Sequence, residues 1–126
     1  MRKPAKYGNR KVTVGGITYA SAKEHRRHQE LKLLERAGKI TDLQRQVKFV
    51  LVPTQREPDT IGPRGGRKPG RLLERELCYI ADFVYTENGK RIVEDVKGYK
   101  GGSAYAEFVI KRKLLLYFHG LRIKET

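Results

Sequence analysis

Two aspartates and a lysine on neighbouring segments form the most chemically suggestive group in the sequence. Asp82 lies in YIADFVY, and Asp95 and Lys97 lie in VEDVKG, on either side of the dipeptide Asn88-Gly89. An Asn-Gly pair between two β-rich runs is a strong signal for a two-residue hairpin turn. With that turn, Asp82 falls opposite Asp95 on one face of the hairpin. Lys97 shares this face, because residues two apart in a strand point the same way.

Two opposed carboxylates repel each other, so a fold that keeps them together must offset the repulsion. Directly opposed residues in a hairpin have Cβ atoms about 4.5–5.5 Å apart. Two explanations are open: a divalent cation bound by both carboxylates, or a proton shared between them. The strands are apolar on both faces, which favours a covered hairpin over a solvated one, where such charges would be ordinary. The register selects Asp95 as the partner of Asp82, because Glu94 points to the other face with Phe83.

A third carboxylate, Glu24, lies near the start of a predicted helix. The segment from Ser21 to Glu24 fits a capping box with Ser21 as N-cap, and the helix is expected to end near Ala37, before Gly38. The apolar stripe of this helix, followed toward its N-terminus, passes through His28 to Glu24. Glu24 is therefore either only a capping residue or a group that reaches the aspartates.

Three convergent carboxylates would form a site of hard oxygen ligands, which suits Mg²⁺ or Mn²⁺. Such a cation lowers the pKa of a bound water and neutralises charge on a phosphate, and Lys97 beside it would stabilise that phosphate or orient the water. Gln46, on the preceding strand, lies either near the metal or simply on a polar strand face. None of the three histidines is expected to bind metal. The sequence contains no GxxxxGK[ST] loop and no HExxH motif.

The overall charge points to a polyanionic partner. The 126 residues include 28 Lys and Arg against 14 Asp and Glu, a formal net charge of +14, and an excess of this size is typical of nucleic-acid binding. The length predicts a single domain over residues 1–126. The single cysteine, Cys78, suits a reducing cytoplasm, and no apolar run is long enough to span a membrane.

The hydrophobic patterns predict a mixed α/β (α+β) domain with a mainly antiparallel central sheet flanked by two helices. The expected elements are a basic arm (1–11), a small hairpin (12–19), the first helix (22–37), a strand (43–52), a flexible basic loop (54–75), the central hairpin (79–97), a second helix (103–119) capped by Ser103, and a last short strand (121–123).

The ordered set of segments resembles the PD-(D/E)XK nucleases, and within them the small phage-encoded endonucleases that are similar to Holliday-junction resolvases. The core of that family is a helix glutamate, an aspartate on one strand and D/E-x-K on the next. These look like Glu24 in SAKE, Asp82 in YIADF and the segment from Asp95 to Lys97 in VEDVKG. The segments YASAKEHRRHQELKLLERAGKI, LQRQVKFVLVP and FVIKRKLL are also similar, so the resemblance covers most of residues 7–120. Ala81 stands where the family motif has a proline.

The resemblance implies a restriction-endonuclease-like core in which Glu24, Asp82 and Asp95 bind one or two Mg²⁺, or Mn²⁺. It implies a catalytic role for Lys97 and an auxiliary role for Gln46. It also implies a homodimer that cuts four-way or otherwise branched DNA in the cytoplasm of a phage host. The basic residues expected to contact DNA are Arg10, Lys11, Arg64, Arg67, Lys68, Arg71, Lys100, Lys111 and Lys113.

Two other functions remain open from the sequence. One is a strand-nicking DNA endonuclease of the same superfamily. The other is a non-catalytic basic module that binds nucleic acid, for which the charge alone would be sufficient.

Overall fold

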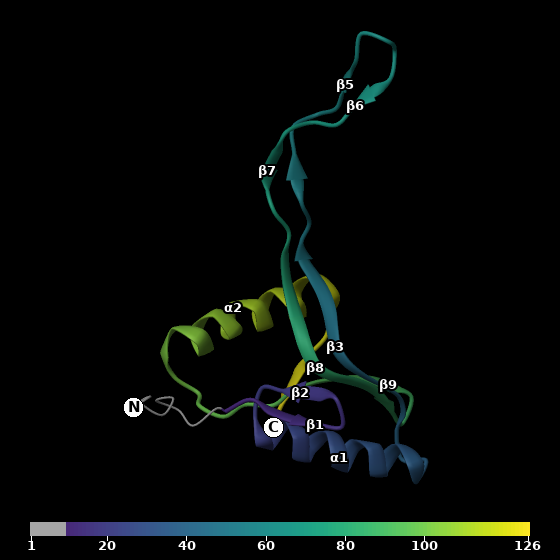
Figure 1. The fold of residues 1–126 in the computed structure, drawn as a ribbon, viewed down its shortest axis with the longest axis vertical. Helices are drawn as coiled ribbons and strands as arrows, with labels where there is room; N and C mark the ends of the chain where they lie inside the picture. Colours follow the sequence, from purple (N-terminus) through teal and green to yellow (C-terminus); the bar gives the residue numbers. More distant parts are fainter. Residues whose placement is uncertain (1–9) are drawn as a thin grey trace.

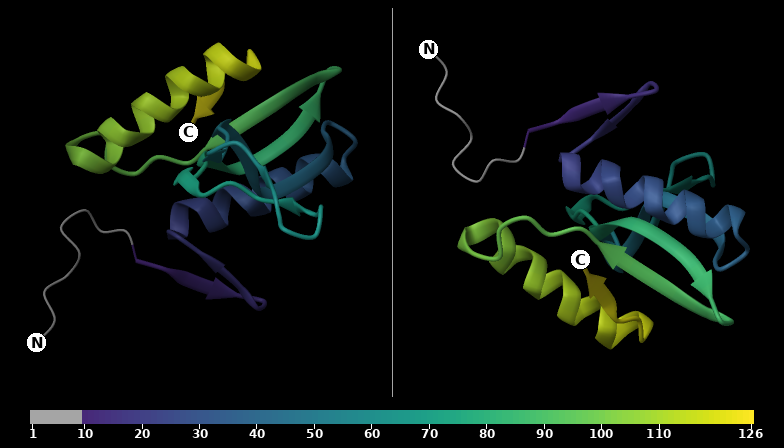
Figure 2. Two further views of the ribbon diagram at one scale, coloured as in Figure 1. Left: turned by 90° about the horizontal axis from the view of Figure 1, so that it is seen from above. Right: turned by 90° about the horizontal axis from the view of Figure 1, so that it is seen from below.

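The computed structural model describes residues 10–126, which form a mixed α+β fold with one central sheet between two helices (Figures 1 and 2). The elements are β1 (Val12–Val14), β2 (Ile17–Tyr19), α1 (Ala22–Arg36), β3 (Thr41–Val52), β4 (Gln55–Arg56), β5 (Thr60–Ile61), β6 (Arg67–Lys68), β7 (Leu72–Glu74), β8 (Leu77–Glu87), β9 (Lys90–Asp95), α2 (Gly102–His119) and β10 (Ile123–Glu125). The predicted basic arm, 1–11, lies outside the described residues except for its last two positions.

The central sheet has the strand order β10-β9-β8-β3. Strands β3, β8 and β9 are antiparallel, and the short β10 runs parallel to β9. The predicted fold class, a mixed and mainly antiparallel sheet flanked by two helices, is confirmed. In the part of the chain that the structure describes, no helix is long and apolar enough to cross a membrane.

The two helices cover opposite faces of the sheet with separate apolar clusters. Leu31 of α1 packs with Phe83 and Tyr85 on one face. Phe108 of α2 packs with Val84 on the other face. Each helix thereby fixes one side of the strands that carry the predicted site.

The Asn88-Gly89 turn sets the register of the central hairpin. Both residues have positive φ, 51° and 75°, as a type I′ turn requires. The pairing runs from Glu87–Lys90 to Phe83–Glu94. The predicted register is therefore confirmed over this range, and Asp82 and Asp95 follow directly after its last pair.

Helix α1 begins and ends at the predicted signals. The Ser21 hydroxyl accepts a hydrogen bond from the Glu24 amide at 3.1 Å, and Gly38 has a φ of 73°. Glu24 and His28 are buried, so the inward face of the helix does become polar toward its N-terminus. The Glu24 carboxylate accepts a hydrogen bond from the amide of Ala20, at 2.9 Å, which places this side chain beneath the β2–α1 connection.

His28 gives the fold a measurable dependence on pH. Its Nδ1 lies 2.6 Å from the Tyr19 hydroxyl, and its ring stacks on Phe83. Burial, followed by nearby positive charges, lowers the pKa of His28 from 6.5 to about 4. As the pH falls, the unfolded chain therefore takes up this proton before the folded one does. The stability that neutral His28 contributes is fully present above pH 6.5 and is lost as the pH falls toward 4.

We expect His28→Gln to narrow the difference in the free energy of unfolding between pH 7 and pH 5, measured by urea denaturation. His119→Gln, on the exposed end of α2, is the matched control and should keep the wild-type difference. An unchanged difference in His28→Gln would show that His28 does not set this dependence.

The segment 54–75 is not the loop without secondary structure that was expected. Strand β4 pairs with β7 and β5 pairs with β6, both antiparallel. These pairs form a long ribbon, residues 53–76, that projects away from the rest of the fold (Figure 1). The earlier expectation was wrong because the pairing of β3 with β8 carries on into the ribbon, and this support is not visible in local sequence patterns.

Two smaller expectations about the C-terminal part were also wrong. The N-cap of helix α2 is Gly101, two residues before the predicted cap Ser103, and it has no side-chain cap, so Ser103 lies inside the helix. The last strand, β10, lies two residues later than the predicted 121–123.

Candidate functional site

Three of the predicted site residues line one pocket of about 290 Å³. They are Glu24 from α1, Gln46 from β3 and Asp82 from β8, and Lys11 also contributes to the wall. The Gln46 amide donates a hydrogen bond to the Glu24 carboxylate at 3.2 Å. The same carboxylate lies 3.6 Å from the Arg45 guanidinium. The fold thus brings together a helix carboxylate and a strand carboxylate that are 58 positions apart in the chain (82 minus 24).

At this pocket, the side chains along β8 switch from one face of the sheet to the other. Pairing of β3 with β8 passes from Arg45–Phe83 to Val47–Ala81, and between them Gln46 has a φ of 52°. A left-handed conformation in a residue other than glycine is uncommon within a strand and tends to occur at functional sites. Side chains two residues apart in β8 therefore do not all share one face of the sheet. Ala81 packs against the α2 side, whereas Phe83 packs against the α1 side.

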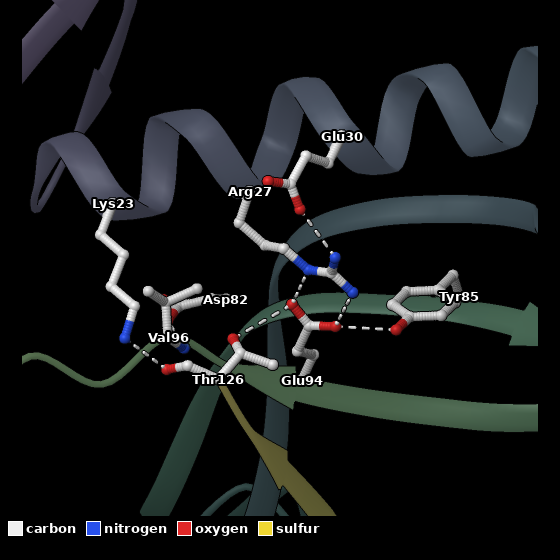
Figure 3. Close-up of polar contacts among 8 residues, drawn as sticks. All are labelled: Lys23, Arg27, Glu30, Asp82, Tyr85, Glu94, Val96 and Thr126. Carbon is white, nitrogen blue, oxygen red and sulfur yellow. Dashed lines mark hydrogen bonds and ion pairs between the residues drawn. The ribbon is translucent and has the colours of Figure 1, made fainter.

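Asp82 lies in a buried, negatively charged environment next to Asp95. Burial first, and then the neighbouring Asp95 carboxylate, raises the pKa of Asp82 from 3.8 to about 7. Glu24 raises the pKa of Asp82 further, while a 2.8 Å hydrogen bond from the Val96 amide lowers it (Figure 3). The Asp82 carboxylate thus lies near both Asp95 and Glu24, and burial together with these two neighbours disfavours its charged form.

Lys97 is held next to this carboxylate group. Its ammonium forms an ion pair with Asp95 and lies 3.3 Å from the centroid of the Phe108 ring on α2. The predicted grouping of Asp95 with Lys97 on one face is therefore observed. A cation fixed over an aromatic ring is restricted in the positions it can occupy, so Lys97 is kept at the edge of the site.

The Arg45 Nε is a buried polar atom without a hydrogen-bond partner within residues 10–126. The Tyr79 hydroxyl is also buried and faces Asp95, because burial, and then the charge of Asp95 and a hydrogen bond to it, raises the pKa of Tyr79. Sequence reasoning missed both residues, because Tyr79 fits an apolar strand pattern and Arg45 fits a solvated one.

Glu94, the neighbour of Asp95, belongs to a separate structural network (Figure 3). Arg27 donates two hydrogen bonds to its carboxylate, at 2.7 and 2.9 Å, and the Tyr85 hydroxyl donates a third at 2.7 Å. Burial raises the pKa of Glu94, but these hydrogen bonds outweigh it and hold the pKa below its ordinary value. Glu94 is thus fully engaged on the α1 face, in agreement with the selection of Asp95 from the register.

The carboxylates of the site suit a hard cation, although the described residues are not arranged as a complete metal site. Within residues 10–126, no three His, Cys, Asp or Glu side chains lie together in the arrangement of a metal site. The predicted ligands Glu24, Asp82 and Asp95 are carboxylates that accept hydrogen bonds or ion pairs from protein groups. Carboxylate oxygens are the ligands that Mg²⁺ and Mn²⁺ prefer. The raised pKa of Asp82, caused by burial and by the nearby Asp95 and Glu24, fits a group of carboxylates that is completed by a cation.

The basic residues predicted on the ribbon fall into two pairs. Arg64 and Lys68 are exposed near its tip and form no ion pair within the described part of the chain. The other two are paired with acidic residues of the ribbon itself, as Arg67–Asp59 and Arg71–Glu57. The first pair is therefore the one available to an external anion.

The remaining predicted DNA contacts are distributed around the body of the fold. Lys11 lines the carboxylate pocket, and Arg10 precedes it as an exposed residue. Lys100 lies 3.9 Å from Glu125, and Lys111 lies 3.3 Å from Glu107. Lys113 is exposed on α2.

Comparison with known proteins identifies one family. No curated protein and no solved structure matched the chain. A family model matches residues 4–124, which is nearly the whole chain. The chain therefore belongs to the family described as "Protein of unknown function (DUF1064)".

Proposed function

We propose that this protein is a metal-dependent DNA endonuclease that hydrolyses phosphodiester bonds at the Glu24–Asp82–Asp95 site. The observation that supports this most directly is the convergence of these carboxylates, from three different elements, with Lys97 beside them. Mutual repulsion among buried carboxylates costs stability in the absence of a partner. A site that retains them is best explained by a cation that they bind.

The proposed metal ligands are Glu24, Asp82 and Asp95. When bound, Mg²⁺ or Mn²⁺ would supply an activated water and neutralise charge on the scissile phosphate. Gln46 holds the Glu24 carboxylate toward the pocket through its 3.2 Å hydrogen bond. Lys97 supplies a positive charge at the edge of the site, where it would stabilise the charge that develops on the phosphate.

The charge of the protein supports DNA as the substrate. A net charge of +14 raises the local concentration of a polyanion around the fold. Lys11 lies in the wall of the carboxylate pocket, where it would contact a phosphate next to the one that is cut. A pocket that holds two carboxylates, in a strongly basic protein, is thus consistent with a metal site inside a DNA-binding surface.

The finer proposal is that the substrate is a four-way junction, that the protein acts as a homodimer, and that it works in the cytoplasm of a phage-infected cell. This part rests on the resemblance to the phage nucleases of the PD-(D/E)XK superfamily. The positive charge and the carboxylate site are equally compatible with a strand-nicking endonuclease.

The test uses an end-labelled four-way junction, with a linear duplex and a forked duplex as controls, each in Mg²⁺, Mn²⁺ and EDTA. We expect paired symmetric cuts in the junction that require the metal. Equal cutting of all three DNAs would support a nuclease without junction selectivity. Binding without cutting in either metal would contradict the proposed activity and would favour a non-catalytic DNA-binding module.

A further inference from the structure

The ribbon 53–76 contributes no residue to the hydrophobic core. Its two legs continue β3 and β8 out of the sheet, and Figure 1 shows it projecting beyond both helices. Each leg has about ten residues, which at about 3.3 Å per residue gives a reach of about 30 Å. A projection of this length exposes much backbone and buries little, so folding alone does not explain it.

Internal contacts define the geometry of the ribbon. The Glu57 amide donates a hydrogen bond to the Arg71 carbonyl at 2.9 Å. The Asp59 carboxylate accepts one from the Gly70 amide at 3.0 Å. A Cβ atom at Gly70 would collide with the Glu57 backbone carbonyl, so the two legs cross there at a distance that only glycine allows.

The tip of the ribbon combines positive charge with an exposed apolar side chain. Ile61 is the last residue of β5 and is 81% exposed. It directly precedes the tight turn 62–66, which is closed by a 2.7 Å hydrogen bond between the Gly62 amide and the Gly66 carbonyl. Arg64 lies in this turn and Lys68 lies just after it.

These features favour DNA over a second protein molecule as the partner of the tip. A second copy of the chain would also carry a net charge of +14, so its approach to a basic ribbon is opposed by like charges. A two-stranded ribbon fits a groove of duplex DNA. Isoleucine is among the side chains that proteins insert between base pairs from the minor groove, and such proteins also place Arg or Lys in that groove.

We propose that the ribbon is a DNA probe in which Arg64 and Lys68 bind phosphates and Ile61 wedges between two base pairs, unstacking them. This inference relies on the proposed function only for the class of substrate, which is DNA. Unstacking is easier at a branch point or a flexible step than within a regular duplex. The wedge would therefore favour DNA that is already distorted, at a distance from the carboxylate site set by the ribbon.

The experiment measures the fluorescence of 2-aminopurine placed beside the crossover of a four-way junction, in EDTA, so that no cutting takes place. Wild type is compared with Ile61→Ala and with Ile110→Ala, an equally conservative change at a 58% exposed isoleucine on α2. We expect wild type and Ile110→Ala to increase the fluorescence on binding. Ile61→Ala should lose most of that increase, while its dissociation constant changes by less than about fivefold.

A second measurement tests the basic part of the tip. The variant Arg64→Gln/Lys68→Gln should lower the slope of log Kobs against log salt by about 2, because each phosphate contact contributes about 0.9 to that slope. A fluorescence increase in Ile61→Ala equal to that of wild type would overturn the wedge. A change in oligomeric state of Ile61→Ala, seen by light scattering with unchanged fluorescence, would assign the tip to a protein contact instead.

The two proposals fail in different ways. Fluorescence changes that depend on Ile61, with no cutting in Mg²⁺ or Mn²⁺, would remove the nuclease and keep the probe. Metal-dependent cutting that is the same in wild type and both tip variants, without a fluorescence increase in any of them, would keep the nuclease and remove the probe.

Discussion

Asp82→Asn is expected to lower the rate of metal-dependent DNA cleavage by about three orders of magnitude while DNA binding is retained. The substitution removes a carboxylate that converges with Asp95 and Glu24. Loss of a metal ligand removes several kcal/mol of transition-state stabilisation, and about 1.4 kcal/mol corresponds to a tenfold change in rate. Phosphate contacts elsewhere on the protein are unaffected, so the dissociation constant should stay within a few-fold of wild type. Single-turnover cleavage and fluorescence anisotropy measure the two quantities separately.

Asp42→Asn is the matched control for this experiment. Asp42 is exposed on β3 and has a φ of 55°, a conformation that asparagine also adopts readily. It should cut at the wild-type rate. If Asp82→Asn also cuts at the wild-type rate, the site assignment is wrong. Asp95→Asn should behave like Asp82→Asn, because both carboxylates are proposed to bind the same cation.

Arg27→Met is expected to destabilise the fold by about 3–5 kcal/mol, the cost of leaving a buried charge without its partner. Glu94 is fully buried, and Arg27 supplies two of the hydrogen bonds to its carboxylate (Figure 3). Urea denaturation at pH 7 measures the free energy of unfolding. The double variant Arg27→Met/Glu94→Gln should recover part of the loss, because it removes the unpaired charge as well.

Arg26→Met provides the control for Arg27→Met. Arg26 precedes Arg27 on α1 and is exposed, so its replacement should change the free energy of unfolding by less than about 0.5 kcal/mol. Equal effects of the two substitutions would show that the Arg27–Glu94 pair has no special part in stability. They would also weaken the argument that Glu94 is structural and Asp95 functional.

The elements that could be predicted from the sequence are those with short-range signals. The Asn88-Gly89 turn fixes the hairpin register through backbone conformations that few residues adopt. The Ser21 cap and Gly38 mark the ends of α1 in a similar local way. The ribbon 53–76 could not be predicted, because its pairing is inherited from β3 and β8 rather than encoded by an apolar pattern of its own.

The candidate site, too, could be predicted only where a local sequence signal was present. The nearness of Asp82, Asp95 and Lys97 follows from hairpin geometry and is observed. The left-handed conformation of Gln46 has no sequence signal, since glutamine is not a residue that favours it. The switch of side-chain faces between Ala81 and Phe83 therefore could not be predicted from the sequence. The approach of the buried Tyr79 hydroxyl to Asp95 could be recognised only after the packing around it was known.

Because β3 and β8 continue into the two legs of the ribbon, a movement of the ribbon is coupled to these two strands. The same two strands carry Gln46 and Asp82 within the sheet and lead directly into the ribbon, whose tip lies beyond them (Figure 1). The tip lies about 30 Å from the base of the ribbon. The candidate site lies in the sheet itself, where α1 and α2 pack against its two faces. If the tip binds DNA as proposed, a load on it would be transmitted to β3 and β8, the strands that carry Gln46 and Asp82.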